Sequence, residues 1–274
     1  MKAILFKLLM VFSITGFVVL IILPLLALLI NIFSNPSFQS IDYNLVLNPL
    51  ILSITTSLAS TIVSLFIGIP LAYILTYKKF PLKDMLDTIV NLPLVVPPTV
   101  AGYLLLITFG RYGLIGHPLH LLGITIMFTT FAIIVAQTFV ALPFMIRGVR
   151  TSLQEISPSL VDAAKTLGAD EYEIFKEIII PMSKPGIISG TILTYARAVG
   201  EFGATVMVCG LLETLPIAIY NNALSGNREV ANILALILII MSFGTLTLFK
   251  RISFEKSMKS YRYLKRLLIK IIPW

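Results

Sequence analysis

Two charged side chains stand one helical turn apart in an otherwise apolar stretch of the sequence, Arg197 and Glu201. Thr194 and Thr205 extend the same face at helical spacing. A charged group at the centre of a membrane span costs about 2.5–3.5 kcal/mol on insertion scales, so both groups need the protein interior or an aqueous path. The pair is either a neutralised packing contact, or a site where Arg197 helps an anion past the middle of the bilayer. Both interpretations stay open at this stage.

A polar stretch between residues 157 and 181 forms the second candidate site. Ser157 can cap a helix that starts at Pro158, Asp162 sits early in that helix, and Gly168 can take the left-handed turn after it. One face of this helix is small and flat, because four residues fall at positions i, i+3, i+4 and i+7: Leu160, Ala163, Ala164 and Leu167.

A second short helix is predicted directly after this one. Asp170 and Glu173 form a capping-box pair at its start, and Pro181 should end it. On capping and amphipathic signals alone, the whole stretch is either a docking element or a solvated helical hairpin without a partner.

The order of residues in this stretch resembles the E-A-A loop of binding-protein-dependent ABC transporter permeases, E-A-A-x3-G-x9-I-x-L-P. Asp162 stands here for the glutamate of that motif and Ile180 for its leucine. In that family the loop docks into a cleft of a cytoplasmic ATPase. The resemblance implies that six residues couple this chain to such an ATPase: Asp162, Ala163, Ala164, Leu167, Gly168 and Pro181.

The composition is that of a polytopic membrane protein. Of the 274 residues, 57% are hydrophobic and 12% are charged, and the mean hydropathy is +0.96, which leaves too few polar residues to cover a soluble surface. Cys209 is the single cysteine, so no internal disulfide is possible, and with His117 and His120 it offers no usable zinc set. We expect no metal or other cofactor on this chain.

Six apolar runs approach or exceed the roughly 20 residues that cross a bilayer: 8–33, 50–77, 89–109, 121–146, 185–211 and 230–249. With the amino terminus in the cytoplasm, 18 of the 21 lysines and arginines fall on the inner side, as the positive-inside rule requires. This topology predicts a plasma-membrane protein with both termini and the 157–181 loop in the cytoplasm. It also accounts for the net charge of +8 without a nucleic-acid partner.

The predicted organisation has three parts: a first span with an external loop (1–49), a permease core (50–250) and a basic tail (251–274). In the tail, apolar residues align on one helical face and cations crowd elsewhere. We expect an amphipathic helix on the lipid of the inner leaflet, with ATPase contact or disorder as alternatives.

Small residues predict close helix packing in two of the spans. The fifth carries a G-x-x-x-G pair, Gly186 and Gly190. The second carries a face that is more typical of a packing seam than of a pore lining: Ser53, Ser57, Ser60, Ser64 and Gly68.

The third span begins with three prolines, Pro93, Pro97 and Pro98, followed by Thr99. Proline removes a backbone donor, and carbonyls freed at membrane depth need protein or water around them. We therefore expect a kinked helix in the protein interior.

Three segments resemble the molybdate and tungstate branch of these permeases: 91–102, 109–116 and 197–205. Sulfate permeases usually carry Tyr and Ser where this chain has Phe202 and Ala204. The resemblance implies an all-α, type I ABC importer permease that forms a homodimer with two cytoplasmic ATPase subunits and an external oxyanion-binding protein. ATP and Mg would act on the ATPase. The path would follow spans three and five, along Pro97, Pro98, Thr99, Thr194, Arg197, Glu201 and Thr205.

Other classes are weighed against this one. A sulfate or thiosulfate permease is the nearest alternative. An ion-coupled secondary transporter should show inverted repeats, and no convincing second copy occurs in the sequence. A membrane-embedded enzyme would need a catalytic cluster in its spans, whereas Arg197 and Glu201 have no His or Asp partner there. No Walker-type glycine-rich loop occurs either, so ATP must be hydrolysed by a separate subunit.

Overall fold

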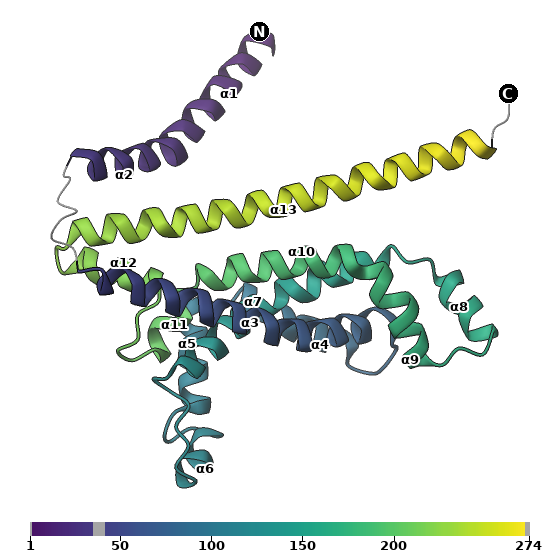
Figure 1. Ribbon diagram of the computed structural model, residues 1–274, viewed down its shortest axis with the longest axis horizontal. Coiled ribbons are helices and arrows are strands. Elements are labelled where there is room, and N and C mark those ends of the chain that lie inside the picture. The colour runs from purple at the N-terminus through teal and green to yellow at the C-terminus, as the bar shows by residue number, and fades with distance from the viewer. Residues whose placement is uncertain (1, 35–41, 272–274) are drawn as a thin grey trace.

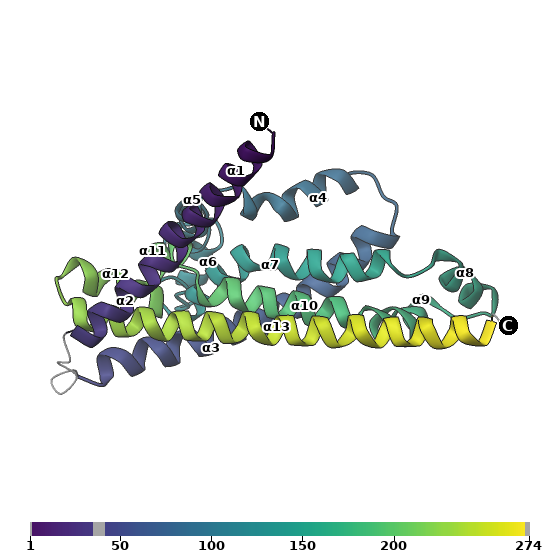
Figure 2. The ribbon, with the colours of Figure 1, turned by 90° about the horizontal axis from the view of Figure 1, so that it is seen from above.

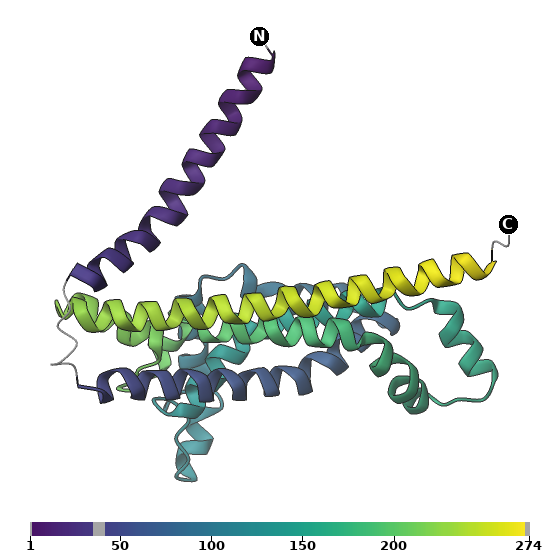
Figure 3. The same cartoon turned by 45° about the horizontal axis from the view of Figure 1, so that its top comes forward.

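The computed structural model describes residues 2–34 and 42–271, with side chains described for 5–34 and 42–251. Its described residues form helices and contain no strand, which confirms the all-α prediction (Figure 1). The first helical rod comprises α1 (Lys2–Phe17), a π-helical segment η1 (Val18–Ile22) and α2 (Leu23–Ser34). α1 stands away from the other helices, and α2 contacts α13 (Arg228–Ile271) (Figures 1 and 3).

Four long helices run side by side and form the body of the molecule (Figure 2). They are α3 (Asn44–Tyr77), α7 (Thr130–Gln154), α10 (Ile180–Val199) and α13. The serine face of α3 is buried, as a packing seam requires: Ser53, Ser57, Ser60, Ser64 and Gly68. A Cβ at Gly68 would lie 2.6 Å from Cγ of Met145 on α7, so this face packs within the chain.

The G-x-x-x-G pair of α10 packs on α7, as predicted. A Cβ added at Gly186 would lie 2.5 Å from the carbonyl oxygen of Gly148, and one added at Gly148 would lie 2.6 Å from Cα of Gly190. Only glycines allow the two backbones to approach this closely.

The third predicted span is sharply bent. α4 (Lys83–Asn91) continues through a 3-10 turn, η3 (Leu92–Leu94), and meets α5 (Pro98–Phe109) at 112°. The proline kink is confirmed. The interior position holds only in part, because Ala101, Gly102 and Leu105 are buried, whereas Pro97, Pro98 and Thr99 are exposed in the single chain. After the bend, α5 packs on α7 through Ala101 and Leu105, and the following α6 (Gly116–Leu121) projects away from the helical body (Figures 1 and 3).

Two predicted spans differ in their bounds. The fourth begins at Thr130, where Thr129 caps the helix, because Gly123 and Phe128 take positive φ in the loop before it. The fifth is broken at residues 200–202, between α10 and α11 (Gly203–Val208). α12 (Leu215–Leu224) then leads into α13.

By length and composition, four helical stretches among the described residues are able to cross a membrane: Leu5–Ser34, Asn44–Tyr77, Thr130–Gln154 and Arg228–Arg251. The bent pair α4–η3 and α5 makes a fifth if it counts as one broken span. The count of six therefore stays a prediction. α13 continues beyond its apolar part to Ile271, but the tail side chains from residue 252 lie outside those described, so the amphipathic tail also stays a prediction.

We predict that Gly148→Val destabilises the protein by about 1–3 kcal/mol or more, because the added side chain has no room against α10. Thermal unfolding of the detergent-solubilised protein measures this as a lower midpoint temperature. Gly244→Val is the matched control, since a Cβ at Gly244 meets nothing within 4 Å. Equal midpoints for the two variants would contradict the packing described here.

Candidate coupling loop and translocation path

The first helix of the polar loop is α8 (Pro158–Thr166). Ser157 occupies the cap position, but its hydroxyl bonds to the Ser159 hydroxyl at 2.6 Å and not to the backbone. Asp162 is the fifth residue of α8. It therefore lies beyond the first turn, which is the part of the helix where the dipole would stabilise a carboxylate. Gly168 takes the predicted left-handed conformation, with φ +89°.

The predicted small face of α8 is mostly exposed. Leu167 is 88% exposed and Leu160 is 41% exposed, Ala163 is exposed, and Ala164 alone is half-buried. The residue that fixes α8 to the body is Val161, which is 8% exposed and which the sequence pattern did not single out. A face of small and apolar side chains is therefore open to another molecule.

The second helix starts as predicted. The Glu173 amide donates to Asp170 Oδ1 at 2.7 Å, and the Asp170 amide donates to Glu173 Oε2 at 3.0 Å, which completes the capping box of α9 (Glu171–Glu173). This helix does not end at Pro181. It passes through a π-helical segment, η4 (Ile174–Ile179), directly into α10.

The π-helical segment explains why the predicted end at Pro181 is wrong. In a regular α-helix, proline clashes with the carbonyl four residues earlier. Here the Ile180 amide already donates five residues back, to the Phe175 carbonyl, and the wider turn relieves that clash. The loop and α10 consequently form one helical rod.

One hydrophobic cluster joins the loop to the helical body. Val161 of α8 and Ile174 and Ile179 of η4 belong to the same buried cluster as Ile156, which follows α7, and as residues of α3 and α7: Ala72, Leu75, Met145, Ile146, Val149 and Leu153. The Tyr77 hydroxyl donates to the Leu153 carbonyl at 3.0 Å. The loop is therefore packed on the ends of α3 and α7.

Polar contacts and a cavity complete this end of the molecule. Lys78, just after α3, forms an ion pair with Glu171, and this hydrogen bond raises the pKa of Lys78 above its ordinary value. A cavity of about 690 Å³ lies between α8 and the end of α3, lined in part by Tyr73, Val161 and Lys165. α8 thus rests on the body through few side chains.

The charged pair of the fifth predicted span forms, although not within one helix. Arg197 lies near the end of α10, whereas Glu201 lies in the break after it. Arg197 Nη2 approaches Glu201 Oε2 at 2.5 Å, with side-chain exposures of 28% and 0%. The other carboxylate oxygen, Oε1, accepts the Ala204 amide at 2.8 Å. Glu201 therefore neutralises Arg197 and caps the first turn of α11.

The two helix breaks meet in the structure. A Cβ at Gly203 would lie 2.6 Å from Cβ of Pro98 and 3.2 Å from the Thr99 nitrogen. A Cβ at Gly102 would lie 2.6 Å from the Ala204 carbonyl oxygen. The start of α5 and the start of α11 are thus in direct contact, which brings Pro98 and Thr99 beside the segment that holds Glu201.

The predicted threonines are both buried. Thr194 and Thr205 are 0% exposed, and neither hydroxyl has a hydrogen-bond partner in the described part of the chain. Gln137 of α7, which sequence reasoning missed, is also 0% exposed with both amide atoms unpaired. An unsatisfied polar group inside a membrane protein is costly, so these three side chains are candidates for contact with water, a ligand or a second subunit.

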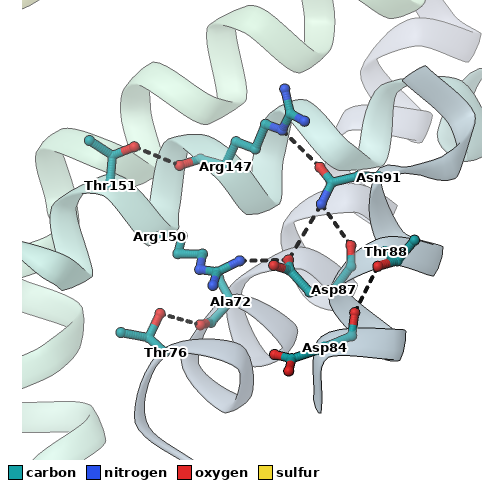
Figure 4. Close-up of polar contacts among 9 residues, drawn as sticks. All are labelled: Ala72, Thr76, Asp84, Asp87, Thr88, Asn91, Arg147, Arg150 and Thr151. Carbon is teal, nitrogen blue, oxygen red and sulfur yellow. Dashed lines mark hydrogen bonds and ion pairs between the residues drawn. The ribbon is translucent and has the colours of Figure 1, made fainter. Parts of the chain in front are cut away.

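A polar cluster between α4 and α7 was also missed (Figure 4). Arg150 Nη1 binds Asp87 Oδ1 at 2.6 Å, and Arg147 Nε donates to Asn91 Oδ1 at 2.8 Å. In the sequence, both arginines had a predicted role only as inner-side charges. A usable signal was present, since Asp87 and Asn91 are spaced i, i+4 and the arginines i, i+3, which places each pair on one helix face.

We predict that Glu201→Gln destabilises the protein by about 3 kcal/mol, because it leaves the partly buried Arg197 without a counter-charge. The glutamine side-chain oxygen can still accept a hydrogen bond from the Ala204 amide. The loss of stability therefore measures the missing negative charge and not a missing helix cap. Thermal unfolding in detergent measures the change.

The double variant Arg197→Met/Glu201→Gln serves as the control, since it removes both charges. It should recover at least half of the lost midpoint temperature. A double variant less stable than Glu201→Gln would argue against mutual neutralisation.

The model of the family described as "Binding-protein-dependent transport system inner membrane component" matches residues 64–258. The molybdenum transport system permease protein ModB of Mycobacterium tuberculosis is 35% identical over 237 residues, which cover 82% of this chain and 86% of that protein. ModB of Escherichia coli K12 is 39% identical over 194 residues, which cover 69% and 81%.

Solved structures agree on the fold. A bacterial alginate ABC transporter, solved with an alginate-bound periplasmic protein, matches with a TM-score of 0.69 and 15% identity over 92% of this chain and 94% of that one. At this identity the likeness concerns the fold alone. From the family match over residues 64–258 and the relatives above 30% identity, this chain belongs to the family of inner membrane components of binding-protein-dependent transport systems.

Proposed function

We propose that this chain is the permease subunit of an ATP-driven importer of molybdate or tungstate. It works as a homodimer with two cytoplasmic ABC ATPase subunits and an external oxyanion-binding protein. The family description and the ModB relatives support this function. ATP is hydrolysed with Mg on the partner ATPase, so the chain itself is a transport subunit and not an enzyme.

The observation that carries this proposal is the way α8 is held. Its outer face, with Ala163 and Leu167, is exposed, while Val161 on the opposite side is buried in a cluster shared with α3 and α7. An exposed face of small and apolar residues suits docking into a cleft, and the buried side transmits force to the helical body. This is the arrangement that a coupling helix requires.

The proposed mechanism follows from these contacts. Closure of the ATPases moves α8, and Val161 with Ile174 passes the displacement to α3 and α7. Because the loop continues as one rod into α10, the same displacement reaches the meeting point of Pro98 and Gly203. Rocking of packed helices then switches the path between inner and outer access.

The exposed break in the third span supports the homodimer. Pro97, Pro98 and Thr99 are exposed, although irregular backbone at membrane depth is tolerated only when protein or water covers it. A second copy of the chain would cover this segment. The path would then run where the two copies meet, past Pro97, Pro98 and Thr99, with Thr194, Arg197, Glu201 and Thr205 behind it.

A sulfate or thiosulfate permease is the second candidate, because these oxyanions share the tetrahedral shape. The ModB relatives favour molybdenum oxyanions, as do Phe202 and Ala204 in the segment where sulfate permeases differ. Choice among such similar anions is expected to rest on the external binding protein.

We predict that Ala163→Arg abolishes ATP-coupled uptake of radiolabelled molybdate into proteoliposomes that contain the whole complex. A long charged side chain cannot enter the cleft that a methyl group fills, so ATPase activity should no longer respond to the loaded binding protein.

Ala163→Ser is the matched control at the same position, and it should retain more than half of the wild-type uptake. Unlabelled tungstate should compete with molybdate, and sulfate should compete weakly. Full uptake by Ala163→Arg with the ATPase bound would overturn the coupling role, and dominant competition by sulfate would reverse the choice of substrate.

Topology gives a separate prediction. In a Cys209→Ser background the chain has no cysteine, so a Lys165→Cys variant carries a single label site on the coupling loop. A membrane-impermeant maleimide should label it in inside-out vesicles and not in intact cells. Labelling from the outside would place the loop away from ATP and contradict the whole assignment.

A further inference from the structure

Two arginines of α7, Arg147 and Arg150, face α4 but differ in their partners (Figure 4). Arg150 forms an ion pair with Asp87 at 2.6 Å, with side-chain exposures of 26% and 35%. Arg147 is exposed and donates only through Nε, to the neutral Asn91 at 2.8 Å. Among residues with described side chains, nothing bonds to its two terminal amino groups. Arg150 is therefore neutralised, whereas Arg147 retains its charge.

Asn91 is fixed in the orientation that this contact needs. Its Nδ2 donates to the Asp87 carbonyl oxygen at 2.7 Å and lies 3.4 Å from Asp87 Oδ1. Because the amide nitrogen faces these acceptors, the amide oxygen is left to face Arg147. The ion pair with Arg150 in turn holds Asp87. A chain of contacts from Arg150 through Asp87 and Asn91 thus orients the Arg147 guanidinium without neutralising it.

An arginine held by Nε presents its two remaining NH2 groups as a planar fork. This fork matches two oxygens of a tetrahedral oxyanion and binds them by two parallel, charge-assisted hydrogen bonds. A lysine at the same place would offer a point charge without this geometry. The chemical class of ligand that fits is therefore a tetrahedral oxyanion.

Arg147 contacts the end of α4 at Asn91, six residues before Pro97 of the proposed path, and it lies nearer to the coupling loop than Arg197. Gly148, its neighbour, is packed against Gly190 of α10. Arg197 is seven residues further along α10, which is roughly 10 Å at the rise of an α-helix. Since α10 starts at the coupling loop, Arg147 lies that much closer to the cytoplasm. The two arginines therefore lie at two different depths.

Their electrostatic states differ as well. Arg197 is neutralised by the fully buried Glu201, whereas Arg147 is paired with a neutral amide. We propose that Arg147, positioned by Asn91, binds the transported tetrahedral oxyanion on the cytoplasmic side of the Arg197–Glu201 pair. This inference rests on the proposed function, because it takes the transported anion as the ligand.

The test uses the purified complex of permease, ATPase and binding protein. Equilibrium dialysis of the permease–ATPase complex in lipid-free detergent measures binding of radiolabelled molybdate, and proteoliposomes measure uptake. Arg147→Gln should lower both molybdate affinity and uptake rate roughly tenfold, since it removes charge-assisted hydrogen bonds. Asn91→Asp should lower the affinity by a similar factor, because a carboxylate neutralises Arg147 while preserving the acceptor.

Control variants separate binding from folding and from general charge. Lys83→Gln removes one cation from α4 at a residue that forms no hydrogen bond or ion pair with Arg147 among the described side chains, and it should bind molybdate within twofold of wild type. Arg147→Lys should give an intermediate affinity. The midpoint of thermal unfolding and the ATPase content are measured for each variant before its affinity is compared with that of wild type. If Arg147→Gln does not fold, Asn91→Asp provides the test in its place.

A lipid phosphate offers the same tetrahedral oxygens, and the experiment distinguishes it. If native mass spectrometry shows an anionic phospholipid held through Arg147 while molybdate binding is unchanged in Arg147→Gln, the inference is overturned. Wild-type affinity in both Arg147→Gln and Asn91→Asp also overturns it. If the wild-type complex transports sulfate and not molybdate, only the proposed substrate is disproved. The role of Arg147 then holds if Arg147→Gln weakens the binding of sulfate.

Discussion

Close packing of α7 between α3 and α10 is the constraint on which the rest of this structure depends. Lipid tails are as apolar as the side chains they meet, so the hydrophobic effect does not hold membrane helices together, and contact between small residues must do so. Gly68 of α3 meets Met145 of α7 on one side, and Gly186 and Gly190 of α10 meet Gly148 of α7 on the other. Because these contacts leave no free space, α7 cannot shift without also displacing its two neighbours.

The coupling loop is attached to the end of this unit in two different ways. Val161 places α8 in the buried cluster with α3 and α7, which is a contact between side chains. The η4 segment joins the loop to α10 covalently, as an uninterrupted helical rod. Pro181 is compatible with that rod because the preceding turn is π-helical. The buried side of α8, with Val161, consequently fixes the helix to the body, while the opposite side, with Leu167, is exposed to a partner.

Charge is distributed along the proposed path in two contrasting arrangements. The Glu201 carboxylate pairs with Arg197 and accepts a hydrogen bond from the Ala204 amide at the start of α11. The ion pair therefore stabilises the helix break and leaves little net charge at that depth. Nearer to the coupling loop, Asp87 neutralises Arg150, and neutral Asn91 orients Arg147. A fixed but uncompensated guanidinium suits an anion that must bind and then leave, since one bidentate contact is strong enough to hold the anion and weak enough to release it.

The sequence by itself determined the helical class, the membrane location, the packing seams and the start of the two helices in the 157–181 loop, because each depends on local composition or spacing that one segment contains. It also identified Arg197 and Glu201 as partners, although it placed them in one continuous helix. Only the tertiary structure decided that this helix breaks at residues 200–202, that the break meets Pro98 and Thr99, and that the chain continues through Pro181. Only the tertiary structure also revealed that Val161 is buried and that Asn91 contacts Arg147, which lies 56 residues further along the chain. Such contacts arise from the way distant helices pack, and no periodicity within a single segment encodes them.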